Sequence, residues 1–347
     1  MNVADKVYAR VSHRVGKYCS GMRIAFATHT ADENPDLLTS LRTRHPQHEI
    51  VQADSGNPDP VIPSAEVLVC VPLSDEQLAS ASKLRCQIIP FTGIDRVQAS
   101  EYLRRCIAVL NSHGNAETVA ERALALLMAV SGRVLEFDQR LRNGNWSRRN
   151  DPRHPFELWR SLRGMRVGLL GTGAIGTAVA TLLEGFGSEL RGCNRSGRPT
   201  LRVPDVTTDV NELAAWADAM VVSLPLTAAT RGLVDARVLA ALGPQGLLVN
   251  VGRGKVVEER ALYKALRDGE IYGAGLDVWY QYPRPFWTES QPSELPFTEL
   301  PNLVCSPHAG SHTAEGKRDQ LLGALDALEA WLAGDPSGHS VDLEAGY

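Results

Sequence analysis

The chain has 347 residues, of which 44% are hydrophobic and 22% are charged, and this is ordinary for a soluble globular protein with two domains. A net charge of −4 and a pI near 6.2 argue against a polyanion-binding surface, so we expect no nucleic-acid partner. No apolar run reaches the roughly 20 residues that span a bilayer. The polar N-terminus lacks the apolar centre of a signal peptide. We therefore expect a cytoplasmic protein without membrane contact, in which residues 1–20 are an extension or an upstream start.

The six cysteines lie far apart, with no CxxC pair and no Cys/His cluster. Several of them fall inside apolar runs. This distribution predicts buried, reduced thiols and neither a disulfide nor a metal site.

Strand-like and helix-like segments alternate along the chain, which predicts an α/β protein with doubly wound parallel sheets. A helix-compatible stretch at 117–141 separates an early group of strands from a later one, and another helical pattern follows residue 310. The expected strands are 22–28, 66–71, 86–91, 165–171, 189–194, 219–224, 246–251, 273–278 and 302–307.

Two Rossmann-like domains with a cleft between them follow from this layout. The substrate domain is expected to be discontinuous, built from residues 1–111 and 309–347. Residues 112–308 are expected to form the larger, nucleotide-type domain.

The segment GLLGTGAIG (168–176) places a glycine-rich turn between an apolar strand and an amphipathic helix. Gly171 permits the tight turn, and Gly173 lets backbone N–H groups approach a pyrophosphate. Gly176 lets the helix pack closely on the strand, with Ala174 and Ile175 at its N-terminus. A glycine-rich turn alone is weak evidence, but strand, turn and helix here have the required order, which predicts dinucleotide binding and makes residues 112–308 the expected NAD(P)-binding domain.

The next strand ends at Asn194, where an NAD site usually has an acidic residue for the ribose hydroxyls. Arg195, Ser196 and Arg198 follow it. An arginine fork can bind a 2′-phosphate that a carboxylate would repel, so we expect NADP to be preferred over NAD. The alternative is that both arginines are solvated loop charges.

Several further motifs occur in one order, and with the glycine turn they resemble the D-isomer-specific 2-hydroxyacid dehydrogenases. This family also contains glyoxylate/hydroxypyruvate reductases, phosphoglycerate dehydrogenases, and formate and phosphite dehydrogenases. The resemblance covers roughly residues 60–347 and implies a homodimer. The motifs are FTGID (91–95), GNAETVAERALAL (114–126), NGNW (143–146), LPLTAATRGLVD (224–235), LVNVGRGKVVEERAL (248–262), GAGLDVWYQYP (273–283) and SPHAGSHT (306–313).

The resemblance implies two catalytic residues, Arg253 and His308. A guanidinium binds a carboxylate bidentately and polarises the carbonyl that receives hydride. An imidazole can donate a proton to the developing alkoxide and accept it in reverse. The alternatives are a surface arginine at a strand end and a structural histidine.

The resemblance also implies binding residues. Gly93 and Ile94 would offer backbone N–H groups to the substrate's acid group, and Asn115 would bind substrate or simply cap the long helix. Asp277 would contact the nicotinamide end of the cofactor. Other expected cofactor contacts are Leu224, Pro225, Thr230, Val251, Gly252 and Gly310.

The run GLDVWYQYP departs from the family pattern, because Tyr282 stands where a glutamate usually raises the pKa of the catalytic histidine. Tyr282 is then a neutral partner of His308, a substrate contact, or the mark of a crippled site that only senses a nucleotide. A misalignment, with Glu289 supplying the acid, is a fourth interpretation.

Aromatic and basic residues could crowd the entrance to the cleft, although scattered aromatics more often serve packing. An arginine-rich entrance would suit a substrate with more than one negative charge, such as a phosphonate. The candidates are Trp146, Arg148, Arg149, Trp279 and Trp287.

The leading interpretation is an NAD(P)-dependent enzyme that transfers hydride between nicotinamide and a small 2-keto or 2-hydroxy acid or related oxoanion. The first alternative is oxidation of a small anion, in the manner of formate or phosphite dehydrogenases. The second is a catalytically weak, nucleotide-sensing interaction protein.

Overall fold

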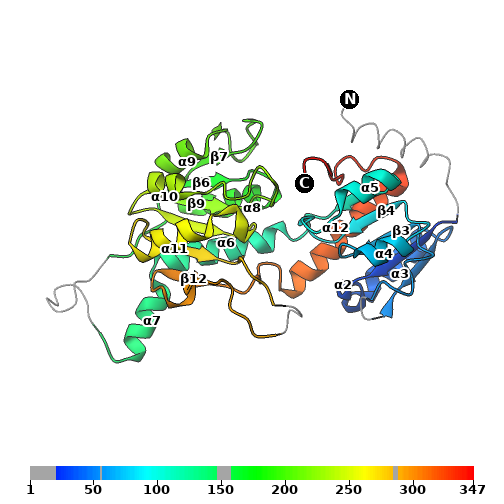
Figure 1. Ribbon diagram of the computed structural model, residues 1–347, viewed down its shortest axis with the longest axis horizontal. Coiled ribbons are helices and arrows are strands. Elements are labelled where there is room, and N and C mark those ends of the chain that lie inside the picture. Colours follow the sequence, from blue (N-terminus) through cyan, green and yellow to red (C-terminus); the bar gives the residue numbers. More distant parts are fainter. Residues whose placement is uncertain (1–20, 55–56, 147–157, 284–287) are drawn as a thin grey trace. The chain divides into compact units, whose positions relative to one another are not determined.

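The computed structural model describes residues 21–54, 57–146, 158–283 and 288–347 (Figure 1). Its contacts divide the chain into two compact units. The first contains the described residues up to Asn115 together with Ser311–Tyr347, and the second contains Ala116–Gly310. Each unit is built around one parallel sheet, so the expectation of an α/β protein with two such sheets is confirmed.

The first unit has a five-stranded sheet in the order β2-β1-β3-β4-β5. Only three of these strands were expected, because β2 and β5 have four residues each and offer too short a pattern to recognise. An antiparallel bridge from Leu110 to Ser340 sets the C-terminal segment against β5. The strands are β1 (Arg23–Ala27), β2 (Glu49–Gln52), β3 (Val67–Cys70), β4 (Cys86–Ile89) and β5 (Ala108–Asn111).

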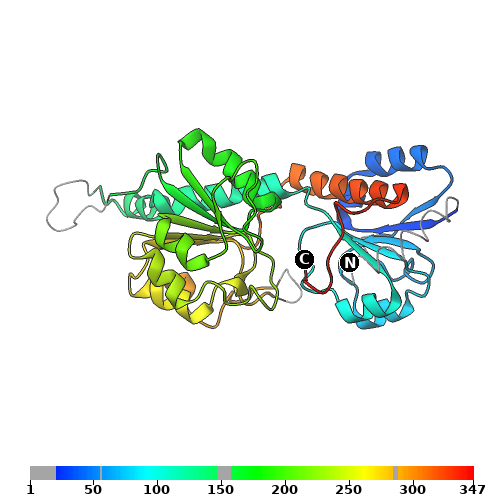
Figure 2. The ribbon, with the colours of Figure 1, turned by 90° about the horizontal axis from the view of Figure 1, so that it is seen from above.

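Helices cover both faces of this sheet (Figure 2). Alternate residues of β1 point to opposite faces, as the two-residue period of a strand requires: Ile24 and Phe26 to one, Ala25 and Ala27 to the other. The first face packs on α2 (His29–Glu33), α3 (Pro35–Arg44) and α12 (Ala314–Ala333), and the second on α4 (Asp75–Ser80) and α5 (Ala99–Arg105).

The second unit has a seven-stranded parallel sheet in the order β12-β11-β10-β9-β6-β7-β8. Six of its strands were expected, and the two-residue β8 was missed. The strands are β6 (Arg166–Leu170), β7 (Glu189–Cys193), β8 (Val206–Thr207), β9 (Ala219–Val222), β10 (Leu247–Asn250), β11 (Gly273–Leu276) and β12 (Leu303–Cys305).

Two helical layers cover this second sheet. In β9, Ala219 and Val221 face one layer, while Met220 and Val222 face the other. The first layer holds α6 (Ala116–Ser131) and α8 (Ala174–Leu183), and the second holds α9 (Val210–Trp216), α10 (Ala236–Leu242) and α11 (Glu259–Arg267). The 3-10 turns are η2 (Glu184–Phe186), η3 (Gly254–Val256) and η4 (Phe297–Glu299).

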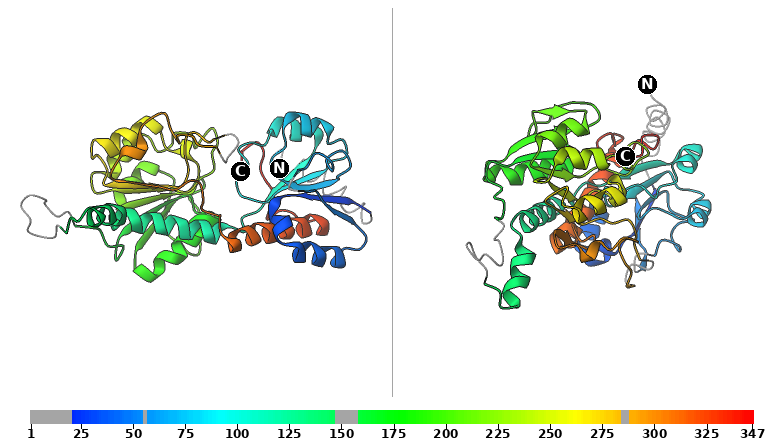
Figure 3. Two further views of the ribbon diagram at one scale, coloured as in Figure 1. Left: turned by 90° about the horizontal axis from the view of Figure 1, so that it is seen from below. Right: turned by 60° about the vertical axis from the view of Figure 1, so that its left-hand side comes forward.

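The helical stretch expected at 117–141 is broken in the structure. α6 ends at Ser131, and α7 (Val134–Arg142) begins after Arg133, whose φ of 52° lies in the left-handed region. A left-handed residue cannot continue a right-handed helix, so the chain changes direction there. None of the residues of α7 is buried, and the helix stands away from the sheet (Figure 3).

The five cysteines in the described part of the chain are free thiols. Cys70, Cys86 and Cys193 are buried as expected, whereas Cys106 and Cys305 are exposed, which corrects the expectation for those two. Cys19 lies outside the described residues. In the same described part of the chain, none of the helices is long and apolar enough to cross a membrane.

Candidate active site

The glycine turn lies between β6 and α8. Gly171 has a φ of 107°, a conformation that favours glycine. A Cβ atom on Gly176 would lie 2.0 Å from the carbonyl oxygen of Gly171, so only glycine lets the helix pass this close to the turn. A Cβ on Gly173 would meet nothing within 4 Å. The turn therefore has a tight bend, a close helix approach and an open position, as a dinucleotide pyrophosphate requires.

The N-terminus of α8 begins beside this turn. Ala174 is the first residue of a ten-residue helix whose first turn contains no acidic side chain. Both Gly173 and Ala174 are exposed. Unpaired N–H groups and the positive end of the helix dipole favour phosphate at such a place, so these residues fit the pyrophosphate of NAD(P).

The loop after β7 is braced by the side chain of Asn194. Its Nδ2 donates to the Thr172 hydroxyl at 2.8 Å and to the Arg198 carbonyl oxygen at 2.9 Å, while its Oδ1 accepts from the Ser196 N–H at 3.1 Å. The amide thus links the loop to the glycine turn, and the exposed side chains of the loop are Arg195, Ser196 and Arg198.

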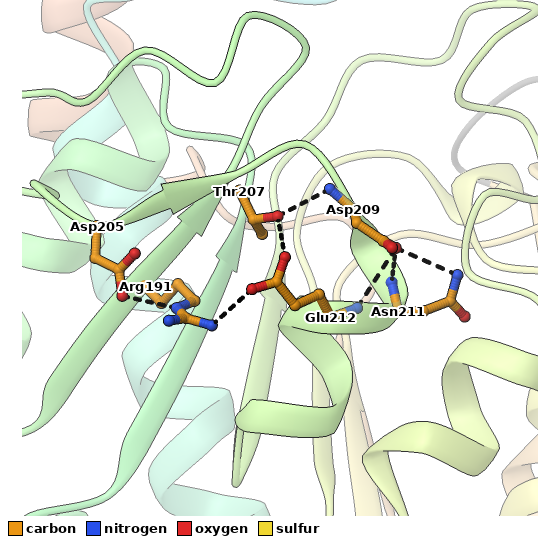
Figure 4. Close-up of polar contacts among 6 residues, drawn as sticks. All are labelled: Arg191, Asp205, Thr207, Asp209, Asn211 and Glu212. Atoms are coloured by element: carbon orange, nitrogen blue, oxygen red, sulfur yellow. Dashed lines mark hydrogen bonds and ion pairs between the residues drawn. The ribbon is translucent and has the colours of Figure 1, made fainter.

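Acidic side chains next to this loop are engaged within the protein (Figure 4). Asp205 and Glu212 pair with the Arg191 guanidinium at 2.7 and 3.2 Å. Asp209 accepts from the N–H groups of Asn211 and Glu212 and so caps α9. These three carboxylates therefore have partners other than a ribose.

The loops after β9 and β10 pack against each other. A Cβ on Gly252 would lie 2.6 Å from the Leu224 carbonyl oxygen, so glycine is required at this contact. The Thr230 hydroxyl donates to the Pro225 carbonyl oxygen at 2.6 Å, which closes the β9 loop. Val251 is buried beneath them. The structure thus gathers five expected cofactor residues at the carboxyl ends of two neighbouring strands.

Arg253 follows β10 and is half-buried. Its Nη1 donates to the Gly252 carbonyl oxygen at 2.9 Å, and its own carbonyl oxygen accepts from Asn250 Nδ2 at 3.0 Å. A Cβ on Gly254 would lie 2.2 Å from the Trp279 carbonyl oxygen, so the arginine loop touches the loop after β11.

His308 lies in a turn that the Asp277 carboxylate holds. Asp277 is 2% exposed and accepts from the Ser306 hydroxyl, from the Ala309 N–H at 2.9 Å and from the Gly310 N–H at 2.9 Å. His308 itself is exposed and has a φ of 57°. A left-handed conformation is unfavourable for a non-glycine residue, so the surrounding hydrogen bonds must maintain it.

Tyr282 lies against His308, with ring centroids 5.5 Å apart and ring planes inclined at 55°. The Tyr282 hydroxyl accepts from the Trp279 N–H at 3.0 Å, and Trp279 Nε1 donates to the Ser306 carbonyl oxygen at 2.8 Å. The structure therefore brings the phenol ring to the imidazole, while its hydroxyl is also bound to the main chain. Glu289 is exposed.

The expected entrance residues do not form one group. Trp279 is buried and packs edge-on against Phe297 with centroids 6.2 Å apart, so its role in packing corrects its placement at an entrance. Trp146 is exposed. Arg148, Arg149 and Trp287 lie outside the described residues.

The substrate residues expected in the first unit follow β4 and β5. Ile94 is buried, Gly93 is half-buried, and Asn115 is buried immediately before α6. The position of Asn115 is compatible with a helix cap and with a substrate contact, so both interpretations stay predictions.

Sequence reasoning missed the bracing role of four residues in the loops of the two units. Ser306, Trp279, Asn250 and Asn111 each use a side chain to hold a main-chain or carboxylate group of a loop. Their spacing carries no signal, because each contact depends on how strands lie side by side in the sheet.

The family follows from comparison with known proteins. Residues 124–310 match the family described as D-isomer specific 2-hydroxyacid dehydrogenase, NAD binding domain. The chain is 34% identical over 276 residues to a glyoxylate/hydroxypyruvate reductase of Arabidopsis thaliana, covering 79% of this chain and 81% of that one. It is 33% identical over 272 residues to a glyoxylate reductase of Thermococcus litoralis, covering 77% and 80%.

A solved structure is similar over nearly the whole chain. The NADPH-dependent glyoxylate/hydroxypyruvate reductase of Sinorhizobium meliloti, in complex with NADP and malonate, is 30% identical with a TM-score of 0.70, covering 93% of this chain and 98% of that one. The present chain therefore belongs to the D-isomer-specific 2-hydroxyacid dehydrogenase family. It is an NAD(P)-dependent oxidoreductase of the 2-hydroxyacid type.

Proposed function

We propose that this protein reduces a small 2-keto acid to the 2-hydroxy acid, with glyoxylate and hydroxypyruvate as the first candidates because its relatives are named for them. The observation that carries this proposal is a continuous series of contacts across the loops after β10, β11 and β12. Gly254 touches Trp279, Trp279 binds Tyr282 and Ser306, and Tyr282 lies against His308.

In this proposal Arg253 binds the substrate carboxylate and polarises the keto oxygen. His308 donates a proton to that oxygen as negative charge develops on it. The nicotinamide cofactor, when bound, supplies the hydride. Gly93 and Ile94 bind the acid group through their N–H groups, and Tyr282 is the neutral neighbour of His308 in place of a carboxylate.

The test is a reduction assay followed at 340 nm with NADPH and NADH. Glyoxylate, hydroxypyruvate, pyruvate, phenylpyruvate and a phosphonate analogue are the substrates. We expect turnover of at least one 2-keto acid, and His308→Ala should abolish it while cofactor binding, measured by fluorescence, persists. Retained turnover in His308→Ala would remove this residue as the proton donor.

A second candidate, oxidation of a small anion, is favoured by the DVW run and by Tyr282 in the glutamate position. The same protein is mixed with NAD or NADP and with formate, phosphite or 2-hydroxy acids. Activity with formate or phosphite, and none with keto acids, would replace the first proposal. Cofactor binding without turnover in either direction would favour a nucleotide sensor.

We also propose a preference for NADP(H) over NAD(H). Arg195 and Arg198 are exposed on a braced loop, and the neighbouring carboxylates of Asp205, Asp209 and Glu212 are engaged elsewhere. A guanidinium there stabilises a 2′-phosphate. The expected result is a kcat/KM with NADPH above that with NADH, and Arg198→Ala should reduce the ratio. Equal or better use of NADH would refute the preference.

A homodimer is the proposed assembly, with α7 as its contact. Val134, Leu135 and Leu141 of α7 are 53%, 53% and 48% exposed, and Met128 of α6 is 46% exposed. An isolated helix of nine residues is marginal in water, because helices shorter than about 12–15 residues need tertiary packing. A second copy of this chain would supply that packing. Light scattering should give twice the monomer mass, and Leu135→Glu should shift it towards monomer.

The described cysteines are free thiols, which suits a reducing compartment. We therefore propose that the enzyme acts in the cytoplasm. Localisation of a tagged chain by fractionation tests this.

A further inference from the structure

Gly93 lies between two residues that the protein holds firmly. On one side, the Thr92 carbonyl oxygen accepts from Asn111 Nδ2 at 3.0 Å, and the Thr92 hydroxyl lies 3.4 Å from the Ser112 carbonyl oxygen and 3.2 Å from His113 Nδ1. On the other side, Ile94 is buried in the core, and its carbonyl oxygen accepts from the Val97 N–H at 2.8 Å.

Asn111 is itself fixed. It is the last residue of β5 and is 5% exposed. Its backbone N–H donates to the His339 carbonyl oxygen at 3.0 Å, so the C-terminal segment holds its main chain. The side chain that reaches Thr92 therefore has little freedom to follow a moving loop.

The geometry of the peptide bond between Thr92 and Gly93 determines where the Gly93 N–H points. In a planar trans peptide the carbonyl oxygen of Thr92 and the N–H of Gly93 point in opposite directions. A hydrogen bond that draws the oxygen towards Asn111 therefore turns the Gly93 N–H away from Asn111. Among the residues that the structure describes, neither the Gly93 N–H nor the Ile94 N–H donates a hydrogen bond within the protein.

We propose that Asn111 is a positioning residue that presents the Gly93 and Ile94 N–H groups, already oriented, to the substrate's carboxylate. This inference rests on the proposed function, which assigns these two N–H groups to the acid group. A loop that is rigid before binding loses less conformational entropy when the anion arrives, so its hydrogen bonds contribute more to affinity.

The test compares Asn111→Ala with Asn34→Ala in the full-length protein. Asn34 Nδ2 also donates to a main-chain carbonyl oxygen, that of Thr30 at 2.9 Å, in the same unit but not in this loop. Three quantities are measured: KM and kcat for glyoxylate, the Kd of oxalate with NADPH present by calorimetry, and the Kd of NADPH by fluorescence. Oxalate is a planar two-carbon anion that needs no turnover to bind.

We expect Asn111→Ala to raise the KM for glyoxylate and the Kd of oxalate about tenfold, or about 1.4 kcal/mol. The kcat should stay within about threefold and the Kd of NADPH should not change, because the variant loses only the hydrogen bond of about this value that holds the loop carrying the Gly93 and Ile94 N–H groups. Asn34→Ala should leave all of these quantities near their wild-type values. Thr92→Val keeps the side-chain shape and removes the contacts of the Thr92 hydroxyl, so it should raise the same KM by a smaller factor. It is the variant to measure if Asn111→Ala fails to fold.

Equal KM and oxalate Kd in wild type, Asn111→Ala and Thr92→Val would overturn the inference. A wild-type protein that binds oxalate but reduces no keto acid would refute the proposed function alone, and the oxalate comparison would still decide the role of Asn111. A wild-type protein that neither binds oxalate nor turns over would refute both.

Discussion

Replacing Asp277 by asparagine exchanges one carboxylate oxygen for an NH2 group inside the turn that carries His308. In the wild-type protein, Oδ1 of the Asp277 carboxylate accepts from the Ser306 hydroxyl and the Ala309 N–H, and Oδ2 accepts from the Gly310 N–H. The best orientation of an asparagine keeps its oxygen at the first position. Its NH2 group then faces the Gly310 N–H, and two donors meet without an acceptor.

The magnitude follows from that lost bond. A hydrogen bond to a charged group contributes about 1.5–3 kcal/mol, and the N–H left behind is buried. With a loss of about 2 kcal/mol, a domain of about 200 residues should melt roughly 4–8 °C lower. His308 holds a φ of 57°, and the weakened turn should relax towards an ordinary conformation. A displacement of about 1 Å at a reacting group can cost about 10²-fold, so we expect a fall in kcat of that order.

Asp277 can hold the turn that carries His308, or it can contact the nicotinamide directly. The melting temperature, kcat and the Kd of NADPH distinguish these two roles. If it acts through the turn, kcat falls while the Kd of NADPH stays within about threefold of wild type. Ser306→Ala is the matched control, because it also removes one hydrogen bond to this carboxylate, at a similar cost of about 1.5–3 kcal/mol, but keeps both N–H bonds that hold the turn, so kcat should fall much less. Wild-type kcat and melting temperature in Asp277→Asn would refute this reasoning, and a large rise in the Kd of NADPH would favour a direct nicotinamide contact.

Three further outcomes are expected. Gly176→Ala places a Cβ 2.0 Å from the Gly171 carbonyl oxygen, so overpacking should lower the free energy of unfolding by about 1–3 kcal/mol and raise the Kd of NADPH at least about tenfold. An unchanged Kd in a fluorescence titration would contradict this. Tyr282→Glu sets a carboxylate beside His308, which favours the imidazolium and should move the pH optimum for reduction upward, and an unmoved profile would remove the pairing. The Arg166 guanidinium lowers the pKa of Asp218 below its usual 3.8, so this pair stabilises the protein above about pH 4 and loses that contribution as the pH falls further. Asp218→Asn should therefore lower the melting temperature at pH 7 and make the fall in melting temperature between pH 5 and pH 3 smaller than in the wild type. A fall as large as that of the wild type would count against a stabilising role of the pair.

Much of the fold was predictable because the sequence patterns that mark strands and turns are local. Apolar runs bounded by turn residues located nine strands, and the order of strand, glycine turn and helix predicted a dinucleotide site at Gly171–Gly176. The family and the use of NAD(P) are confirmed. The signal failed where elements are very short, as in β2, β5 and β8, and where Arg133 adopts a left-handed conformation that composition does not reveal.

Sequence alone determined which residue types stand at the ends of the strands: the glycines, Arg253, His308 and the tyrosine in place of an acid. Only the tertiary structure decided which side chains hold them. Asp277 reaches a turn some thirty residues along the chain, Asn111 reaches a loop some twenty residues before it, and Trp279 is buried under the site. Such contacts depend on the register of neighbouring strands, because parallel pairing brings the ends of distant segments together at one edge of a sheet.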